Sequence, residues 1–186
     1  MFWKYRKEIG ISGTEQMIFV TVGTHEQQFD RLVKEVDRLR KNGDIEEEVI
    51  AQIGFGTYEP VSCQWSRFYP YQKMCEYVDE ARIVITHGGP SSFLAPLQRG
   101  KVPIVVPRQK QFGEHVNDHQ VEFCRAIAEQ QRNIIIMEDI GGLWDAVENY
   151  DSIVLGLDMR ESNNNTSFVK KFESTVEELM QKGKKG

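Results

Sequence analysis

The stretch that decides the fold covers residues 83–92 and reads Ile83-Val84-Ile85-Thr86-His87-Gly88-Gly89-Pro90-Ser91-Ser92. An apolar, β-branched run ends here in a tight glycine turn, and the turn carries two hydroxyl groups and opens a helix. The first backbone N–H groups of a helix have no partner within it, so they point outward toward anything anionic. The stretch therefore predicts a strand, a turn and a helix start that can bind an anionic group.

A second junction of the same kind follows along the chain. After the apolar run of residues 102–106, a polar loop leads into another helix and reads Phe112-Gly113-Glu114-His115-Val116-Asn117-Asp118-His119-Gln120. Two successive strand-to-helix junctions place two helix N-termini at one edge of a parallel sheet. We interpret this edge as a site for the diphosphate of a sugar nucleotide.

The same alternation of strands and helices continues through the chain. Strands are predicted over residues 17–22, 48–54, 63–68, 82–86, 102–106 and 133–137. Helices are predicted over residues 29–39, 71–78, 93–100, 116–127, 140–147 and 168–180. This spacing predicts an α/β fold, namely a Rossmann-like parallel sheet with helices on both faces. Ligands of such folds bind where the strand-to-helix loops gather.

The chain length of 186 residues indicates one domain. Residues 1–16 are expected to form an N-terminal extension, either a poorly ordered leader or an amphipathic contact segment. Residues 17–160 are expected to form the binding domain, and residues 161–186 a polar loop, a helix and a tail. Pro96 is expected in the first turn of its helix, because helix interiors reject proline.

Composition excludes several classes of protein. A net charge of -5 gives no sign of a nucleic-acid binder, and three widely spaced cysteines do not form a disulfide framework. No run approaches the roughly 18 apolar residues of a membrane span, and no signal peptide is recognisable. We therefore expect a cytoplasmic protein.

The glycine turn holds the first group of candidate binding residues. Gly88 and Gly89 let the backbone approach a ligand without interference from a Cβ atom. Ser91 and Ser92 can cap the helix and can also bind a phosphate. The alternative is a turn that is needed only for its geometry.

All four histidines fall in predicted strand-to-helix loops or at the helix starts that follow them: His25, His87, His115 and His119. This shared location favours a functional role for the histidines over a chance distribution along the chain. A zinc site would need three or four converging ligands, and no pair here has the spacing of a zinc motif. We therefore expect no metal.

Two further segments are predicted at the same edge. Gly23, Thr24 and His25 form a second short anion-binding candidate, which lacks both the dinucleotide fingerprint and the P-loop pattern. Redox cofactors and ATP are therefore not expected. Tyr69 lies in an aromatic loop, residues 68–71, that either walls a flat base or packs locally.

The polar loop and helix start hold carboxylates, imidazoles and an amide, which can bracket a sugar through paired hydroxyl hydrogen bonds. These candidates are Glu114, His115, Asp118, His119 and Gln120. The alternative is helix capping by Asn117 or Asp118, which needs no ligand.

Three motifs, in the same order, resemble a known enzyme family. They are Gly23-Thr24 followed by Phe29-Asp30-Arg31-Leu32, then Thr86-His87-Gly88-Gly89, and finally Asp118-His119-Gln120. They resemble the catalytic subunit of the two-part lipid-linked oligosaccharide N-acetylglucosaminyltransferase and its bacterial relatives in capsule and exopolysaccharide synthesis. The similarity covers most of residues 17–130 and identifies the chain with the C-terminal half of GT-B glycosyltransferases, a family 28-like domain.

The resemblance implies a UDP-sugar donor and an inverting, metal-independent transfer to a lipid-pyrophosphate-linked acceptor, with no cofactor. It also implies a membrane-anchored partner subunit that supplies the missing half and holds this chain at the cytoplasmic membrane face. A half-enzyme with uncovered apolar surface favours a partner or self-association. A non-catalytic subunit that binds a UDP-sugar or stabilises a transferase is the alternative.

Within this hypothesis, the pyrophosphate lies on the helix that begins near Ser91 and Ser92. Asp118 and Gln120 orient the sugar. His25 is the candidate base in this chain, although relatives that join both halves place the base on the other half. The wider family has a ribose-binding glutamate where this chain has Ala95-Pro96, so Glu114 or a backbone group is expected to replace it, or the ribose is recognised differently.

Overall fold

The computed structural model describes residues 16–131 and 133–157. Its strands are β1 (Met17–Thr21), β2 (Glu48–Gln52), β3 (Gln64–Ser66), β4 (Ile83–His87), β5 (Ile104–Val106) and β6 (Ile135–Ile136). Its α-helices are α2 (Asp30–Asn42), α3 (Tyr71–Glu80), α4 (Pro90–Gln98), α5 (His119–Gln131), α6 (Leu143–Glu148) and α7 (Tyr150–Gly156). Two 3₁₀ turns are η1 (Lys110–Phe112) and η2 (Ile140–Gly142). The predicted N-terminal extension and the predicted helix over residues 168–180 lie outside the described residues.

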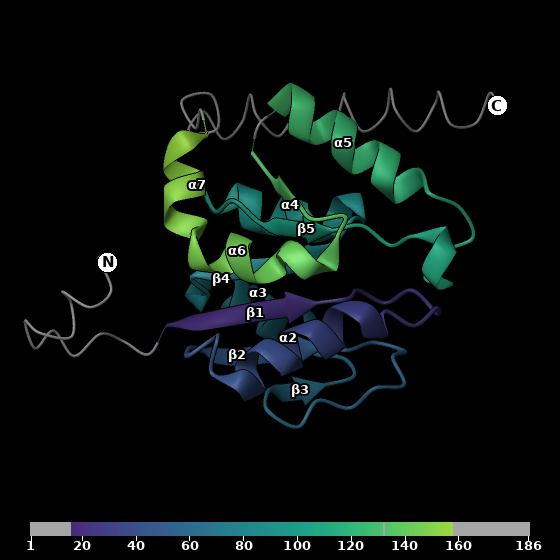
Figure 1. Ribbon diagram of the computed structural model, residues 1–186, viewed down its shortest axis with the longest axis vertical. Coiled ribbons are helices and arrows are strands. Elements are labelled where there is room, and N and C mark those ends of the chain that lie inside the picture. Colours follow the sequence, from purple (N-terminus) through teal and green to yellow (C-terminus); the bar gives the residue numbers. More distant parts are fainter. Residues whose placement is uncertain (1–15, 132, 158–186) are drawn as a thin grey trace, which may run out of the picture.

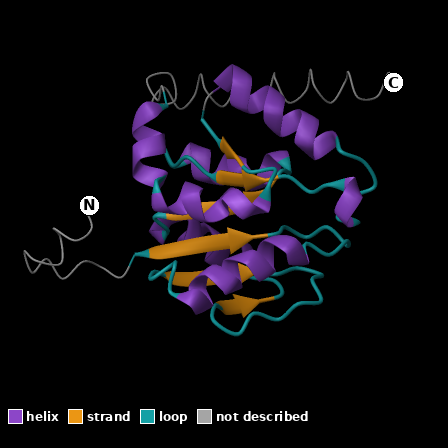
Figure 2. Ribbon diagram, viewed as in Figure 1, coloured by secondary structure: helices purple, strands orange, loops and turns teal. Residues whose placement is uncertain are grey.

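The six strands form one parallel sheet in the order β3-β2-β1-β4-β5-β6 (Figures 1 and 2). This arrangement confirms the predicted α/β, Rossmann-like fold. The chain builds outward from β1 to β3 and then crosses back to place β4 on the other side of β1. The carboxyl ends of β1 and β4 flank the point where the strand order reverses, which is where ligands of open α/β sheets bind.

The strands bury both faces of the sheet, as parallel strands do. On β1, Ile18 and Val20 belong to the core shared with α2 and α6, whereas Phe19 belongs to the core shared with α3. Figure 1 shows α2 and α6 in front of the sheet and α3 behind it. A further apolar cluster packs α4 and α5 against β5, through Phe93 and Cys124. Full burial of one such aliphatic or aromatic side chain is worth about 1.5–3 kcal/mol.

The first helix follows its sequence pattern closely. Leu32, Val33, Val36 and Leu39 recur at helical spacing, and each is at most 2% exposed. Gly43 ends α2 in the left-handed conformation with φ of 81°, as the predicted Asn-Gly stop requires.

Two local predictions were wrong, and one helix was missed. Pro90 occupies the first turn of α4, whereas Pro96 lies buried in its interior, where it has no N–H to donate to the carbonyl of Ser92. Helix α5 begins at His119 and not at Val116, whose side chain is 67% exposed and has no core to face. Helix α7 was not predicted, since its short sequence carries only one deeply buried residue, Tyr150.

Candidate functional site

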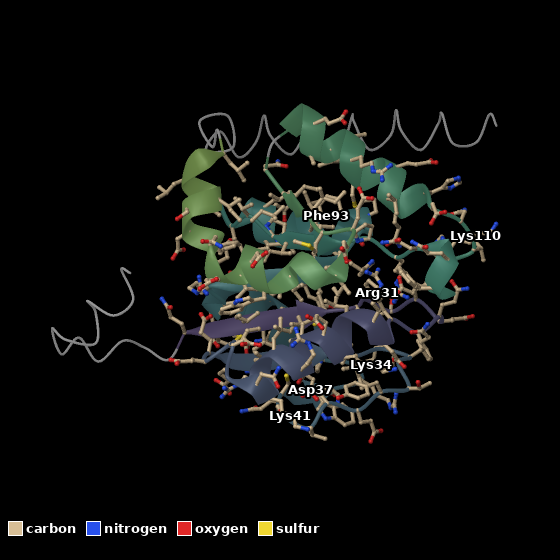
Figure 3. The ribbon with its side chains drawn as sticks, in the orientation of Figure 1. Arg31, Lys34, Asp37, Lys41, Phe93 and Lys110 are labelled. Carbon is tan, nitrogen blue, oxygen red and sulfur yellow. The ribbon has the colours of Figure 1, made fainter. Side chains whose placement is uncertain are left out.

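Three strand ends meet at the carboxyl edge of the sheet. The loops that follow β1, β4 and β5 carry most of the predicted site residues, and β4 lies between the other two strands. Figure 3 shows Arg31 and Lys110 on the side of the molecule toward which β1 points. The edge therefore brings together loops that lie more than eighty residues apart in sequence, as in the Arg31–Glu114 contact across 83 residues.

A row of polar side chains fixes the first of these turns. Gln52 donates to Thr21 Oγ1 at 3.2 Å, and the backbone N–H of Gly23 donates to the same oxygen at 3.2 Å. The other end of the Gln52 amide accepts from the backbone N–H of Tyr69 at 3.0 Å. Neighbouring strands are thereby joined at the level where Gly23 turns away from the sheet, at a positive φ of 74°.

His87, the last residue of β4, is the centre of the site. Its Nδ1 accepts a hydrogen bond from the backbone N–H of Gly89 at 3.0 Å, and its Nε2 is hydrogen-bonded to Ser92 Oγ. A Cβ atom on Gly23 or on Gly89 would lie 2.3 Å from the imidazole ring. Both glycines are therefore required because the ring fills the space between them, which is a more specific reason than backbone freedom alone.

The protonation of His87 follows from these contacts. Burial and the positive charge of Arg108 lower its pKa to about 3, against an upward effect of a hydrogen bond with Gln120. The ring is neutral at pH 7, and because Nδ1 accepts from Gly89, the single proton lies on Nε2. That proton is donated to Ser92 Oγ, so the Ser92 hydroxyl keeps its own proton to donate toward a bound anion.

Helix α5 packs directly against the glycine turn. A Cβ atom on Gly88 would lie 2.8 Å from Cys124 Sγ and 3.1 Å from Pro107 Cα, so no larger residue fits there. Gln120, at the start of α5, accepts from the backbone N–H of Arg108 at 3.1 Å. The packing of α5 on β4 therefore brings together two separately predicted candidates, His87 and Gln120.

His25 and His115 meet across the edge. Their ring centroids lie 5.1 Å apart, although one residue follows β1 and the other follows β5. Burial lowers the pKa of His25, and the charges of Arg108 and His115 lower it further against the opposing effect of Glu26. A neutral, exposed imidazole is chemically able to accept a proton.

Glu114, predicted as a ligand contact, is paired within the protein. Its side chain is fully buried, and both oxygens are bound by Arg31, at 2.9 Å from Nε and 2.9 Å from Nη2. Oε2 also accepts from the backbone N–H of Gln109 at 3.0 Å. With both oxygens hydrogen-bonded within the protein, Glu114 fixes the loop after β5.

The remaining candidates lie around this centre. Asp118 accepts from the backbone N–H of Lys110 at 2.9 Å, which shapes the loop. Thr24, Ser91 and His119 are exposed at the same edge. Tyr69 lies apart from the His87 group: it packs against Tyr77 with ring centroids 5.1 Å apart, beside β2, so that β1 separates it from β4.

Sequence reasoning missed the two arginines of the edge. Arg31 binds Glu114 from α2, and Arg108, two residues after the end of β5, is only 1% exposed. The available signal was a charged residue shortly after a buried strand, at the edge where ligands bind.

Among the residues that the structure describes, no group of three or more histidine, cysteine or acidic side chains is placed to hold a metal ion. No described helix is both long enough and apolar enough to cross a membrane.

A parallel sheet with this strand order, glycine turns at its carboxyl edge and a neutral histidine holding a helix-start serine defines a Rossmann-like ligand-binding domain. Residues 17–138 match the glycosyltransferase family 28 C-terminal domain. The chain belongs to this family, and it is therefore a GT-B C-terminal-half domain, as its resemblance predicted.

Individual relatives agree with this assignment. The chain is 34% identical over 119 residues to the human UDP-N-acetylglucosamine transferase subunit ALG13, a match that spans 59% of this chain and 10% of that protein. Among solved structures, the fold resembles the spinosyn forosaminyltransferase SpnP, with a TM-score of 0.54 and 12% identity over 91% of this chain and 42% of that one. It also resembles the kitacinnamycin glycotransferase, with a TM-score of 0.51 and 16% identity over 88% of this chain and 40% of that one. These structural likenesses support the fold, and the chain spans less than half the length of each relative.

Proposed function

We propose that this chain is the donor-binding, catalytic subunit of a glycosyltransferase that uses a UDP-sugar. The observation that carries the proposal is the His87 centre, where two glycines, a neutral imidazole and the Ser92 hydroxyl converge at a helix N-terminus on the ligand-binding edge. Family membership and the similarity to a UDP-N-acetylglucosamine transferase subunit support this class of donor.

In the proposed reaction, the pyrophosphate lies over the start of α4. The Ser92 hydroxyl and the positive end of the α4 dipole stabilise the negative charge that develops as UDP leaves. Removal of one such donor typically lowers the rate by about 10²–10³. Gln120, Asp118 and His119, at the start of α5, orient the sugar.

A single displacement at the anomeric carbon completes the proposed chemistry. The acceptor hydroxyl attacks this carbon, the bond to the diphosphate oxygen breaks, and the configuration is inverted without a metal ion. A base must take the acceptor proton. His25 is the candidate in this chain, because it is exposed beside the site and its lowered pKa keeps it neutral; a base from the partner subunit is the alternative.

We further propose a membrane-anchored partner that supplies the acceptor-binding half and a lipid-pyrophosphate-linked saccharide, in the synthesis of capsule or exopolysaccharide. The similarity to one subunit of a transferase supports a partner of this kind. The exposed apolar side chains of the carboxyl edge are consistent with a covering protein, since Phe55, Phe68 and Phe112 are 42–49% exposed in loops that follow β2, β3 and β5.

Donor binding is tested first on the isolated chain. Isothermal titration calorimetry with UDP and UDP-sugars should give saturable binding that Ser92→Ala weakens. The matched control is Ser66→Ala, whose hydroxyl donates to the Phe68 carbonyl beside β3, away from His87. A chain that binds no uridine nucleotide would contradict the proposal.

Catalysis is tested with the partner present. Ser92→Ala and Gln120→Ala should lower sugar transfer strongly, and His25→Ala should abolish it only if the base lies in this chain. A chain that binds UDP but adds nothing to a partner that is already active would support the non-catalytic alternative.

A further inference from the structure

Arg108 is a large, charged side chain in the interior of the ligand-binding edge. It lies two residues after the end of β5, and only 1% of it is exposed. Nη1 donates to the backbone carbonyls of Gln27, Gln28 and Glu114 at 2.9–3.2 Å, and Nη2 donates to the carbonyl of Val22 at 2.9 Å. The guanidinium therefore ties the loop after β1 to the loop after β5, with β4 and the His87 turn between them.

The charge of Arg108 has no carboxylate partner among the described residues. All of its hydrogen bonds go to carbonyl oxygens, and the nearest acid, Glu114, gives both oxygens to Arg31 (labelled in Figure 3). Two guanidinium groups and one carboxylate leave a net charge of +1 in this buried cluster of Arg31, Arg108 and Glu114. Arg108 Nε is also buried without a hydrogen-bond partner.

A buried cation that faces only carbonyl oxygens and the Phe29 ring, 4.7 Å from its Cζ, and no carboxylate is unfavourable, so its retention needs a reason. Burial lowers the pKa of Arg108 to about 10, against the favourable field of Glu114. The same charge lowers the pKa values of both His87 and His25, so its field reaches both sides of the glycine turn. Solvent and salt screen a buried charge weakly, and its effect on an anion at this edge is correspondingly large.

We propose that Arg108 is the positioning residue of the donor site: it sets the spacing of the two loops and leaves one buried positive charge for a bound pyrophosphate to neutralise. This inference rests on the proposed function, and it explains why the site would prefer a nucleoside diphosphate to a nucleoside. UDP must then bind much more tightly than uridine, and the ratio of the two affinities must depend on Arg108.

The test measures UDP and uridine affinities of the full chain by calorimetry. In Arg108→Met, the ratio of UDP affinity to uridine affinity should fall by about tenfold, because a buried charge near a dianion is removed. Arg108→Lys keeps the charge but not the planar fork, so it should restore the ratio within about threefold while weakening uridine as the loops shift. Arg82→Met is the matched control, because Arg82 pairs with Glu47 at the opposite, amino edge of the sheet.

A second measurement follows the imidazole of His25 by NMR, with Arg108, His115 and Glu26 as its charged neighbours. Its pKa should rise toward the ordinary value of 6.5 in Arg108→Met and stay lowered in Arg108→Lys. If Arg108→Met does not fold, the retained ratio and weakened uridine binding of Arg108→Lys still test both parts of the proposal.

The two levels of the argument fail differently. A folded Arg108→Met variant with an unchanged ratio, or an Arg108→Lys variant that loses it, overturns the role of Arg108 and leaves UDP binding intact. A wild-type chain that binds no UDP overturns the proposed function and, with it, the ligand assigned to this charge.

Discussion

The confinement of the His87 ring can be tested by adding one methyl group at a time. In Gly23→Ala the new Cβ would lie 2.3 Å from Nε2, at a residue whose φ is 74°; in Gly89→Ala it would lie 2.3 Å from Cε1, at an ordinary φ of -75°. Gly100 has φ of 70° and open space around the position of its Cβ. Gly100→Ala therefore shares the backbone strain of Gly23→Ala but not the contact with the ring.

These geometries separate two contributions to the free energy of unfolding. Left-handed backbone costs an alanine about 1–2 kcal/mol, which is all that Gly100→Ala should lose. Crowding of a packed interior costs about 1–3 kcal/mol, which is the expected loss in Gly89→Ala. Gly23→Ala combines both and should lose about 2–5 kcal/mol.

Urea unfolding, followed by circular dichroism at constant m-value, measures these losses. UDP affinity gives a second measurement, because a displaced ring no longer holds Ser92: Gly23→Ala and Gly89→Ala should bind UDP weakly, and Gly100→Ala should bind normally. Equal losses of stability in Gly23→Ala and Gly100→Ala would show that the His87 ring moves aside freely. The assignment of Ser92 as a held phosphate donor would then be refuted.

Three further predictions follow from buried polar contacts. Glu114→Gln leaves Arg31 buried without its carboxylate, so urea unfolding should show a loss of about 3–5 kcal/mol in the free energy of unfolding. The double variant with Arg31→Met should recover part of this loss, and losses that simply add in the double variant would contradict the pairing. Lys101→Met removes three hydrogen bonds of 2.6–2.7 Å to carbonyls at the end of α3, and thermal unfolding should show a loss of about 2 kcal/mol. Lys73→Met removes only an exposed pair with Glu76 and should leave the unfolding temperature nearly unchanged. The pKa of His87 falls from 6.5 to about 3 on folding, so the unfolded chain binds more protons than the folded chain between these pH values. The free energy of unfolding should therefore decrease as pH falls, by up to about 1.4 kcal/mol per pH unit. His87→Gln should reduce this slope, and an unchanged slope would count against a neutral, buried ring.

The parts of the fold that the sequence predicts are those with a local cause. β-branched runs mark β1, β4 and β5, and the Asn-Gly pair ends α2, because period and turn chemistry act within a few residues. Pro96 and α7 escaped prediction because their placement depends on tertiary packing. The lost hydrogen bond of a helix proline has to be offset by the packing of its buried ring, and a short helix with one deeply buried residue has no period to recognise.

The site divides in the same way. The glycine turn and the histidines were found because each follows a strand, and parallel topology brings strand ends together. The role of Glu114 was not predictable, since its partner Arg31 lies 83 residues away and nothing local distinguishes a buried ion pair from a free ligand. Arg108 escaped notice for the same reason, as its partners are backbone carbonyls, which carry no signature in the sequence.

These contacts also explain why the site and the core are one cooperative unit. Gly23 after β1 and Gly89 after β4 enclose the same ring, and Arg108 after β5 reaches back to the loop after β1. A change at any of the three strand ends therefore shifts the others, so a loss of activity does not by itself identify a ligand contact. A bound donor should stabilise all three loops together by mass action, so the gain in unfolding temperature at a fixed UDP concentration reports a variant's loss of donor affinity separately from its loss of stability without UDP.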